Sequence, residues 1–363
     1  MKIAILHPFF DVIGGAEVLV LTLAKELDAT IYTTNIDYTK IKKMGFDDVN
    51  IKSLGRVPNN PPFRHLLVLA KFRRLNFKNK FDNYIITGDW AISGAVNNKP
   101  NLWYIHSPNR EIWDLNQDVR LGFNVIKRFL FDIWVKYYRH LNKKYIKHIK
   151  LLVSNSKNTQ RRVKMYLKRN STIINPPTET SKYFNNKPKN YWLSVNRLSW
   201  TKRVEIQLKA FATLPNEKLI IVGSFENSKH NIAYANHCKK TKPENVEIVS
   251  NVEFKKLLEL YANCKGFITT AKDEDFGMTP VEAMASGKPV IAGNEGGYKE
   301  TVIHAKTGIL IDDINSDKLA EEIKKMSEGL KANPNKYKTN CINRAKEFDT
   351  KEFIKKMKKT IKK

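Results

Sequence analysis

The sequence is short of cysteine, of acidic residues and of long apolar runs, and each shortage excludes a class of protein. Its three cysteines, Cys238, Cys264 and Cys341, stand far apart and are odd in number, which excludes a disulfide framework and suits a reducing compartment. No apolar run approaches the roughly 18 residues of a membrane-spanning helix. The first residues, MKIAILHPFF, lack the cleavage site of a signal peptide. We therefore expect a cytoplasmic protein.

Acidic residues number 36 against 64 basic ones, so the net charge is +28. Such a surplus attracts anionic partners: nucleic acid, acidic lipid or phosphorylated small molecules. From Arg120 to Lys150 the chain has nine Lys or Arg and a single acid, Asp132, and apolar residues recur there at three- and four-residue steps. This pattern predicts a basic amphipathic helix. A second basic stretch with aromatic residues covers 63–78.

The basic stretches allow three interpretations. Each is a core-facing helix with lysines on its polar face, a surface that contacts an anionic membrane, or a nucleic-acid site. For the membrane interpretation the contact residues are Lys127, Arg128, Lys136, Arg139, Lys143 and Lys144.

Short runs rich in valine and isoleucine alternate with helical patterns along the whole chain. The expected strands are 2–6, 30–34, 84–87, 102–106 and 150–154 in the first half, and 192–195, 218–222, 246–249, 266–270 and 289–292 in the second. The expected helices include 17–27, 204–212, 254–264 and 317–330. This alternation predicts an α/β protein with doubly wound parallel sheets, whose ligands bind at the carboxyl ends of the strands.

The segment NPPTETSKYFNNKPKN, near residues 175–190, is rich in Pro, Asn and Lys and has no periodicity, which is typical of a linker. We expect a Rossmann-like domain over 1–176, the linker over 177–190 and a second Rossmann-like domain over 191–345. A basic helix over 346–363 would pack back on the first domain. The two domains would face each other across a cleft.

Three strand-to-helix turns carry groups that bind anions. The glycine pair at 14–15 opens a helix, whose N-terminal N–H groups and dipole favour an anion. Arg197, Lys202 and Arg203 follow an expected strand, either as a solvated loop or as a diphosphate clamp. The stretch 277–279 precedes another helix. No His or Cys grouping has the spacing of a metal site, so we expect side chains and helix ends to balance a ligand's phosphate charge.

Two glutamates, Glu274 and Glu282, stand eight positions apart in DEDFGMTPVEAMAS. On one helix that spacing corresponds to roughly 12 Å, which is too far for the paired carboxylates of a retaining glycosidase, about 5 Å apart. Thr279 and Glu282 have the form of a capping box with Pro280 at the first helical position. Glu274 then lies on the preceding loop. From these residues alone, Glu282 is a helix cap or a ligand-binding acid, and Glu274 is a solvated acid or a site residue.

Four blocks of the sequence together resemble the retaining GT-B glycosyltransferases of the family 4 class, the glycosyl transferases group 1. The blocks are GGAE, YIHSPNREIWDL, NRLSWTKR and EDFGMTPVEAMASGKPVIAGNEGG. Their order and spacing are similar to the family's, and the likeness covers nearly the whole chain. The second and fourth blocks look most like mannosyltransferases that use GDP-mannose. The sequence departs from the family pattern at Asn196 and Phe225.

The resemblance implies a nucleotide-sugar donor held mainly by the second domain and an acceptor held by the first. Its implied catalytic residues are His106, which would contact the sugar near the reacting carbon, and Glu274, which would lie near the transferred sugar. Without the resemblance, a histidine after a strand is more often an ordinary polar group. Ser107 and Arg110 would lie on the acceptor side. The implied donor-binding residues are Gly14, Gly15, Arg197, Lys202, Phe276, Gly277, Met278, Thr279 and Glu282.

The activity implied is retaining, metal-independent transfer of a hexose, with mannose favoured. The donor is GDP-mannose or a UDP-sugar such as UDP-glucose, and no other cofactor is expected. The acceptor is a lipid-linked sugar or a polysaccharide at the inner face of the cell membrane. Competing interpretations are a sugar-nucleotide epimerase or phosphorylase of the same fold and, from another class, a basic nucleic-acid-binding protein. Charge supports the last one, and we expect no nucleic-acid partner.

Overall fold

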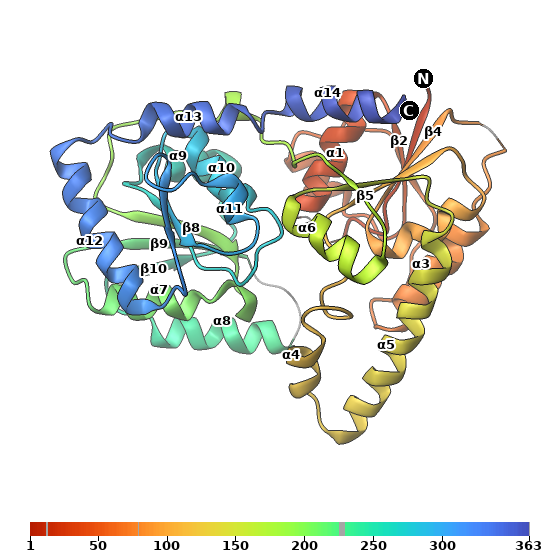
Figure 1. Cartoon of the computed structure of the whole chain (residues 1–363), viewed down its shortest axis with the longest axis horizontal. Coiled ribbons are helices and arrows are strands. Elements are labelled where there is room, and N and C mark those ends of the chain that lie inside the picture. Colours follow the sequence, from red (N-terminus) through yellow and green to blue (C-terminus); the bar gives the residue numbers. More distant parts are fainter. Residues whose placement is uncertain (12–13, 79, 225–228, 363) are drawn as a thin grey trace. The chain divides into compact units, whose positions relative to one another are not determined.

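The computed structural model describes residues 1–11, 14–78, 80–224 and 229–362, and the chain divides into two units. The first unit comprises Met1–Asn175 with Ile354–Lys363, and the second comprises Pro176–Phe353. Each unit has one parallel β-sheet with helices around it (Figure 1). The doubly wound α/β architecture predicted from the sequence is thereby confirmed for each unit.

The first unit has a seven-stranded sheet in the order β3-β2-β1-β4-β5-β6-β7. Its strands, all paired in parallel, are β1 (Ile3–Leu6), β2 (Thr30–Thr33), β3 (Ile51–Ser53), β4 (Asn83–Thr87), β5 (Asn101–Ile105), β6 (Leu151–Ser154) and β7 (Thr172–Ile173). All four residues of β1 are buried, because both faces of a doubly wound sheet are covered. The strand order reverses between β1 and β4, so ligands are expected at the carboxyl ends of these two strands.

Most of the first unit's helices bury apolar residues in its core, but α4 (Asn116–Leu121) has no buried residue. The other helices are α1 (Gly15–Leu27), α2 (Tyr38–Lys43), α3 (Phe63–Arg74), η1 (Asp89–Val96), α5 (Val125–Ile146), α6 (Lys157–Arg162) and η2 (Val163–Leu167). The core closes around large side chains such as Trp103 and Phe72, which are fully buried. The buried residues of α5 all lie in its second half, from Val135 to Ile146. Its first half leaves the body of the unit, and the turn between α4 and α5 lies far from the sheet (Figure 1).

The second unit has a six-stranded sheet in the order β10-β9-β8-β11-β12-β13. Its strands, again paired in parallel, are β8 (Trp192–Arg197), β9 (Leu219–Ser224), β10 (Val246–Val249), β11 (Phe267–Thr269), β12 (Val290–Gly293) and β13 (Gly308–Ile311). The order reverses between β8 and β11. The loops after β8, β11 and β12 therefore meet at the edge of the sheet where ligands bind in doubly wound folds.

The second unit's helices are η3 (Thr180–Lys182), η4 (Trp200–Lys202), α7 (Val204–Ala212), α8 (Lys229–Thr241), α9 (Phe254–Asn263), α10 (Met278–Ala285), α11 (Tyr298–Thr301), α12 (Ser316–Ala332) and α13 (Lys338–Lys346). The last helix, α14 (Thr350–Ile361), begins in the second unit and ends in the first. Ile361 lines a surface pocket of the first unit together with Met1, Asn83 and Pro100. The end of α14 thus packs beside the amino ends of β1 and β5.

Residues 177–190, which the sequence suggested as a linker, are held on the second unit. The backbone N–H groups of Asn186 and Lys189 donate to the carbonyls of Ala262 and Asn263 over 3.0 and 2.7 Å. The Asn185 side-chain amide donates to the carbonyl of Ser286 over 2.7 Å. The segment is therefore bonded to the residues that end α9 and α10.

Candidate active site

The second unit brings Lys202 and Glu274 together at the carboxyl ends of its strands. Lys202 ends η4, after β8, and Glu274 lies on the loop after β11. Lys202 Nζ donates to Glu274 Oε2 over 2.5 Å, and the two side chains are 17% and 20% exposed. An ion pair with this much solvent contact contributes little net stability. Its informative feature is its position, because it joins a cation and a carboxylate across the switch point of the sheet.

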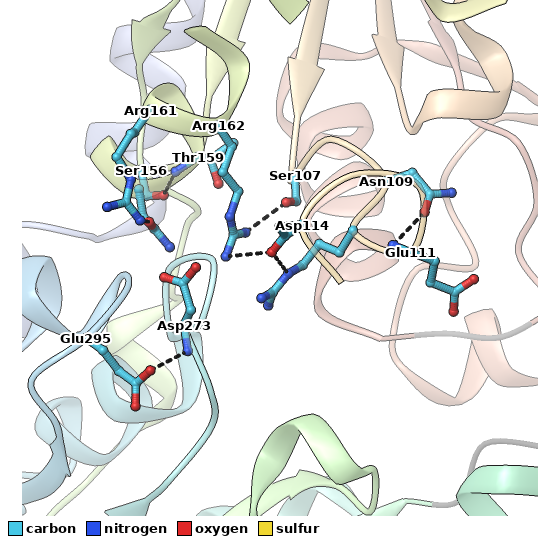
Figure 2. A network of polar contacts seen from close by, with 12 residues as sticks. Ser107, Asn109, Glu111, Asp114, Ser156, Thr159, Arg161, Arg162, Asp273 and Glu295 are labelled. Carbon is cyan, nitrogen blue, oxygen red and sulfur yellow. Dashed lines mark hydrogen bonds and ion pairs between the residues drawn. The ribbon is translucent and has the colours of Figure 1, made fainter. Parts of the chain in front are cut away.

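A second ion pair fixes the loop that carries Glu274. Arg203 donates from Nε to the carbonyl of Thr270 over 2.6 Å and from Nη2 to the carbonyl of Ala271 over 3.2 Å. Its Nη2 also pairs with Glu295 Oε1. Glu295 Oε2 in turn accepts from the backbone N–H of Asp273 over 2.9 Å (Figure 2). Arg203 and Glu295 therefore hold the backbone of residues 270–273 in place through hydrogen bonds.

Two glycines hold the same loop from the side of β12. A Cβ atom on Gly296, whose φ is +56°, would lie 2.6 Å from the backbone N and O of Glu274, and one on Gly297 would lie 2.4 Å from Phe276 Cα. Gly297 N–H donates to the carbonyl of Glu274 over 2.7 Å. Any larger residue would push the loop away, so glycine is required at both positions.

The helix after this loop begins earlier than the expected capping box, and that expectation is wrong. Helix α10 starts at Met278 with Gly277 as its N-cap, and no side chain caps it. Gly277 reverses the chain at φ +92°, a conformation that glycine adopts readily. Thr279 and Pro280 are therefore the second and third helical residues. Pro280 fits there because its missing N–H would have no intrahelical partner in the first turn.

Glu282 consequently caps nothing and is half-buried in the second unit. Its Oε2 accepts a hydrogen bond from the buried Tyr261 hydroxyl over 2.7 Å. Burial raises the pKa of Glu282, and the hydrogen bond from Tyr261 acts in the opposite direction. The tyrosine thus orients a carboxyl group on the first turns of α10.

The other donor-binding candidates of the second unit lie around the same edge of the sheet, whereas Gly14 and Gly15 lie in the first unit. Arg197 ends β8 with an exposed side chain, and Met278 and Thr279 are half-buried in the first turn of α10. Phe276 is buried, with its ring 5.3 Å from that of Phe348, so only its backbone can face a ligand. Asn196 donates to Ser194 Oγ over 2.9 Å. Phe225 lies outside the described residues.

In the first unit a backbone N–H of the glycine pair at 14–15 donates to a glutamate side chain. Helix α1 begins at Gly15, and the N–H of its N-cap, Gly14, donates to Glu17 Oε2 over 2.8 Å. Glu17 Oε1 lies 3.7 Å from His7 Nε2, and His7 Nδ1 lies 2.8 Å from Thr87 Oγ1. Burial acts to raise the pKa of Glu17, but His7 and the Gly14 N–H outweigh it, so the net pKa is lowered. His7 follows β1 and Thr87 ends β4, so this group stands at the switch point of the first sheet.

His106 follows β5 in the same unit and is half-buried. Burial lowers its pKa to about 4, and His7 adds to this while Glu17 opposes it. Its ring lies edge-on to that of Tyr104 at 5.3 Å, and its carbonyl accepts from Thr159 Oγ1 over 3.0 Å. His106 Nε2 is buried without a hydrogen-bond partner among the described residues. A neutral imidazole with an unsatisfied buried nitrogen is suited to bind a ligand hydroxyl.

The two acceptor-side candidates belong to a polar network on the loop after β5. Ser107 Oγ accepts from Arg162 Nη1 over 3.0 Å, and Arg162 Nη2 lies 3.7 Å from Asp114 Oδ2 (Figure 2). Arg110 Nε donates to the same Asp114 oxygen over 2.8 Å. Ser107 is thus held by the cation Arg162, and Arg110 is held by the carboxylate of Asp114. Asp114 also lies close to Arg162 and so links the two candidates.

Asp89, at the start of η1 two residues after Thr87, is a buried carboxyl group near this edge of the sheet. Its Oδ2 accepts from the N–H of Asn109 over 2.8 Å. Burial raises the pKa of Asp89 to about 7, although Asn109 and Tyr138 oppose the rise. Asp89 therefore titrates near neutral pH.

The six basic residues expected at a membrane surface all lie on α5. Arg128 donates to the carbonyls of Phe123 and Leu121 over 2.8 and 3.1 Å, and Arg139 donates to the carbonyl of Ile112 over 3.1 and 2.6 Å. The exposed ones are Lys127, Lys136, Lys143 and Lys144. The arginines therefore have structural partners, while the lysines face solvent.

Sequence analysis missed His7, Glu17 and Glu295. Glu17 stands in the GGAE block and Glu295 in the GNEGG end of the last block, so both were within the quoted family blocks. His7 directly follows the first expected strand, as His106 follows another. A search for polar residues at strand ends would have found His7 and Glu295, whereas Glu17 lies in the first turn of α1.

Across the parts of the chain that the structure describes, no three His, Cys, Asp or Glu side chains gather as a metal ion would require. Within the same parts, no helix combines the length and the apolar character needed to cross a membrane.

Comparisons with known proteins find a glycosyltransferase family model and mannosyltransferase relatives. Residues 177–348 match the family model described as Glycosyl transferases group 1. Alpha-1,3/1,6-mannosyltransferase ALG2 from Dictyostelium discoideum is 27% identical over 85% of this chain and 86% of that protein. The ALG2 protein of Candida glabrata is 26% identical over 94% of this chain and 88% of its own length.

Solved structures share the fold over the whole chain. The Anabaena protein Alr3699/HepE in complex with UDP and glucose has a TM-score of 0.77 at 19% identity, covering 100% of this chain and 99% of that one. Sucrose-phosphate synthase from Thermosynechococcus elongatus has a TM-score of 0.74 at 16% identity, covering 99% and 98%. At these identities the likeness establishes the fold. The chain therefore has the GT-B fold, and its residues 177–348 match the model of the glycosyl transferases group 1 family.

Proposed function

We propose that the protein is a retaining mannosyltransferase that moves mannose from a nucleoside-diphosphate sugar to a lipid-linked or polysaccharide acceptor. The observation that carries this proposal is the Lys202–Glu274 pair at the switch point of the second sheet. It combines a cation for a diphosphate with a carboxylate for a sugar on the loop that leads into α10. Support for mannose comes from the two ALG2 proteins, which are named mannosyltransferases and align with most of the chain.

The donor belongs to the second unit in this proposal. Arg197, Lys202 and the N-terminus of α10 bind the diphosphate, because arginine, lysine and helix N–H groups all favour phosphate oxygens. Glu282, oriented by Tyr261, accepts hydrogen bonds from the ribose hydroxyls. We favour GDP-mannose as the donor, with a UDP-sugar as the alternative.

The reaction exchanges one bond for another at the anomeric carbon. The bond between that carbon and the donor's phosphate oxygen breaks, and the acceptor hydroxyl oxygen bonds to the carbon on the same face. The hydroxyl proton passes to the leaving diphosphate, so the products are the mannosylated acceptor and a nucleoside diphosphate. Lys202 and the α10 dipole stabilise the charge that develops on the leaving group. We propose that these groups balance that charge without a divalent metal.

The acceptor belongs to the first unit in this proposal. Neutral His106 offers its unsatisfied Nε2 to a sugar hydroxyl, beside the ionised Glu17 and Thr87-bound His7. Ser107 and Arg110 lie on the loop that follows. We propose that transfer takes place at the inner face of the cell membrane, with the exposed lysines of α5 toward anionic lipid.

A thermal-shift panel of GDP-, UDP- and ADP-sugars tests the donor. A ligand at 100 times its Kd stabilises the folded state by about 2.7 kcal/mol, which raises the melting temperature by roughly 5 to 10 °C for a domain of this size. We expect GDP-mannose to give the largest shift. Lys202→Ala should abolish most of it, and Lys209→Ala, an exposed lysine of α7, should not.

Product analysis then tests the chemistry. We expect an α-linked mannoside from the α-linked donor, and transfer that persists with a chelator. Absence of a shift with every nucleotide sugar would overturn the proposed function, and an inverted product would overturn the retaining mechanism.

A further inference from the structure

The outward face of α5 changes character along its length. In the first half, large apolar side chains stand in solvent: Val125, Ile126, Phe129, Leu130 and Ile133 are 79%, 73%, 66%, 58% and 50% exposed. Leu121, at the end of α4, is 65% exposed. In the second half the exposed residues include Lys136, His140, Lys143 and Lys144. One helix face is therefore apolar at its free end and basic where it joins the unit.

These apolar residues are not a core-facing stripe. Ile126, Phe129 and Ile133 follow three- and four-residue steps and so share a face of the helix. The buried residues of α5, Val135 and Tyr138 among them, lie on the opposite face. A contiguous group of exposed large apolar residues marks an interaction surface.

The turn that carries this surface is held in a fixed form. Arg120 of α4 donates from Nε to both carboxylate oxygens of Asp132 on α5 over 2.9 and 3.1 Å. The rings of Phe123 and Phe131 meet edge to face at 5.3 Å. Arg128 donates to the carbonyls of Leu121 and Phe123. The exposed side chains are thus presented by an ordered hairpin of helices.

We propose that the α4–α5 tip inserts into the acyl layer of an anionic lipid bilayer, and we define the tip as Leu121, Val125, Ile126, Phe129, Leu130 and Ile133. From Val125 to Ile133 the helix extends roughly 12 Å, comparable with the roughly 5 to 10 Å depth of interfacial helices. Lys136, Lys143 and Lys144 then lie at the level of the headgroup phosphates. The inference rests on the proposed function, because a lipid-linked acceptor presents its sugar at the membrane surface.

The lysines beside the tip favour a bilayer over a second copy of the chain as the partner of this surface. In a symmetric dimer the same surface meets itself. The lysines beside one tip would then approach those beside the other, and like charges repel. An anionic bilayer offers acyl chains to the tip and phosphates to the lysines. Salt also distinguishes insertion from adsorption by charge alone. High salt screens charges over a few ångströms and weakens adsorption, whereas an inserted apolar tip stays bound.

A fluorescent label measures insertion directly. Phe129→Cys provides an exposed thiol, whereas the native cysteines Cys238, Cys264 and Cys341 are all buried. Lys331→Cys, exposed on α12 of the second unit, is the matched control. With vesicles that contain phosphatidylglycerol, we expect an environment-sensitive dye at 129 to shift to the blue and to be quenched by lipids with quenchers in the acyl chains. The dye at 331 should stay in water. A dye at 129 that stays in water would overturn the proposal.

Vesicle partition separates the apolar contribution from the charged one. Phe129→Ser with Leu130→Ser should weaken partition on the order of 100-fold at low and high salt, because two large apolar side chains are lost. Lys143→Gln with Lys144→Gln should weaken it roughly 30-fold, at low salt only. If the serine pair leaves partition unchanged but converts a dimer in solution to a monomer, the tip binds a second copy and the proposal falls.

The thermal-shift test with the donor distinguishes failure of this inference from failure of the proposed function. The serine pair should keep the wild-type thermal shift with the donor, because neither residue contacts the candidate active site. If no nucleotide sugar stabilises the wild type while the label at 129 enters the bilayer, the proposed function falls and insertion stands. If a donor stabilises it while the label stays in water, insertion falls and the proposed function stands.

Discussion

The two sheets have the same architecture, yet their switch points carry opposite chemistry. At the first, the side chains are two histidines and one carboxylate. His7 Nδ1 lies 2.8 Å from Thr87 Oγ1, Glu17 Oε1 lies 3.7 Å from His7 Nε2, and His106 Nε2 has no hydrogen-bond partner among the described residues. At the second, they are ion pairs, Lys202 with Glu274 and Arg203 with Glu295. The parallel sheet provides the location in both units, and the loops provide the chemistry.

Solvation explains the difference between the two sites. Burial keeps His106 neutral by lowering its pKa to about 4, which leaves hydrogen-bonding groups suited to hydroxyls. Lys202 and Glu274 stay 17% and 20% exposed, so the lysine can exchange its carboxylate partner for a phosphate oxygen. A neutral sugar and a diphosphate are the ligands that these two environments favour.

The largest expected effect comes from removing the carboxylate of the second site. Glu274→Gln should reduce transfer on the order of 1000-fold, because a preorganised charge near the reacting sugar is lost. The affinity for the nucleoside diphosphate should change only a few-fold. Single-turnover transfer and calorimetry measure the two quantities. Glu328→Gln, on the exposed side of α12, should alter neither. A Glu274→Gln enzyme with the wild-type rate would remove Glu274 from catalysis.

The next effect separates the sites by their ligands. Lys202→Met should weaken nucleoside-diphosphate binding about 10- to 100-fold, since a hydrogen bond to a charged group is lost. His106→Ala should leave that affinity unchanged, because we propose that the diphosphate binds to the second unit. Calorimetry with the nucleoside diphosphate alone checks both variants. Equal losses of affinity in both variants would mean that the two sites do not bind different ligands, despite their chemical contrast.

The fold could be predicted because buried parallel strands and amphipathic helices leave strong local patterns. The expected helix 204–212 and strand 246–249 coincide with α7 and β10. The strands β3 and β7 were missed because they are short and largely exposed edge strands of three and two residues. Local pattern was too weak there to predict a strand.

Candidate site residues could be named from the sequence, but the contacts between them could not. Lys202 and Glu274 are 72 positions apart, and no spacing reveals their ion pair. The capping box failed because Gly277, at positive φ, starts the helix before Thr279. On α5, periodicity indicated an amphipathic helix without indicating which side packs. The structure turns Ile126, Leu130 and Ile133 toward solvent.

A smaller effect is expected from the carboxylate of the first site. Glu17→Gln should raise the acceptor KM or lower kcat by about tenfold, because His7 loses its anionic neighbour and the group near His106 is reoriented. Donor affinity should stay at the wild-type value, in contrast to Lys202→Met. Steady-state kinetics with varied acceptor measures the effect. A loss of donor affinity instead would show that Glu17 acts through the fold, and the melting temperature would report this.

The smallest expected effect is on the pH dependence of stability. His106 and Asp89 change the stability in opposite directions as the pH falls. The pKa of His106 is lowered to about 4, so the unfolded chain binds the proton more readily and stability is lost as pH falls from about 6.5 to 4. Asp89, with its pKa raised to about 7, has the opposite sign: its folded state holds the proton, so stability is gained as pH falls from 7 to about 4.

His106→Gln should therefore shrink the fall in melting temperature between neutral and acid pH, by roughly 2 to 4 °C per kcal/mol removed. Part of the fall should remain, because His65 also has a pKa lowered to about 4 by burial, with Arg64 adding to it. Asp89→Asn should steepen the fall, because the compensating group is gone. Thermal melts of the three proteins across pH 4 to 7.5 decide the matter. If both variants move the slope in the same direction, the histidine at the first site is not held neutral by burial, and the contrast in solvation between the two sites fails.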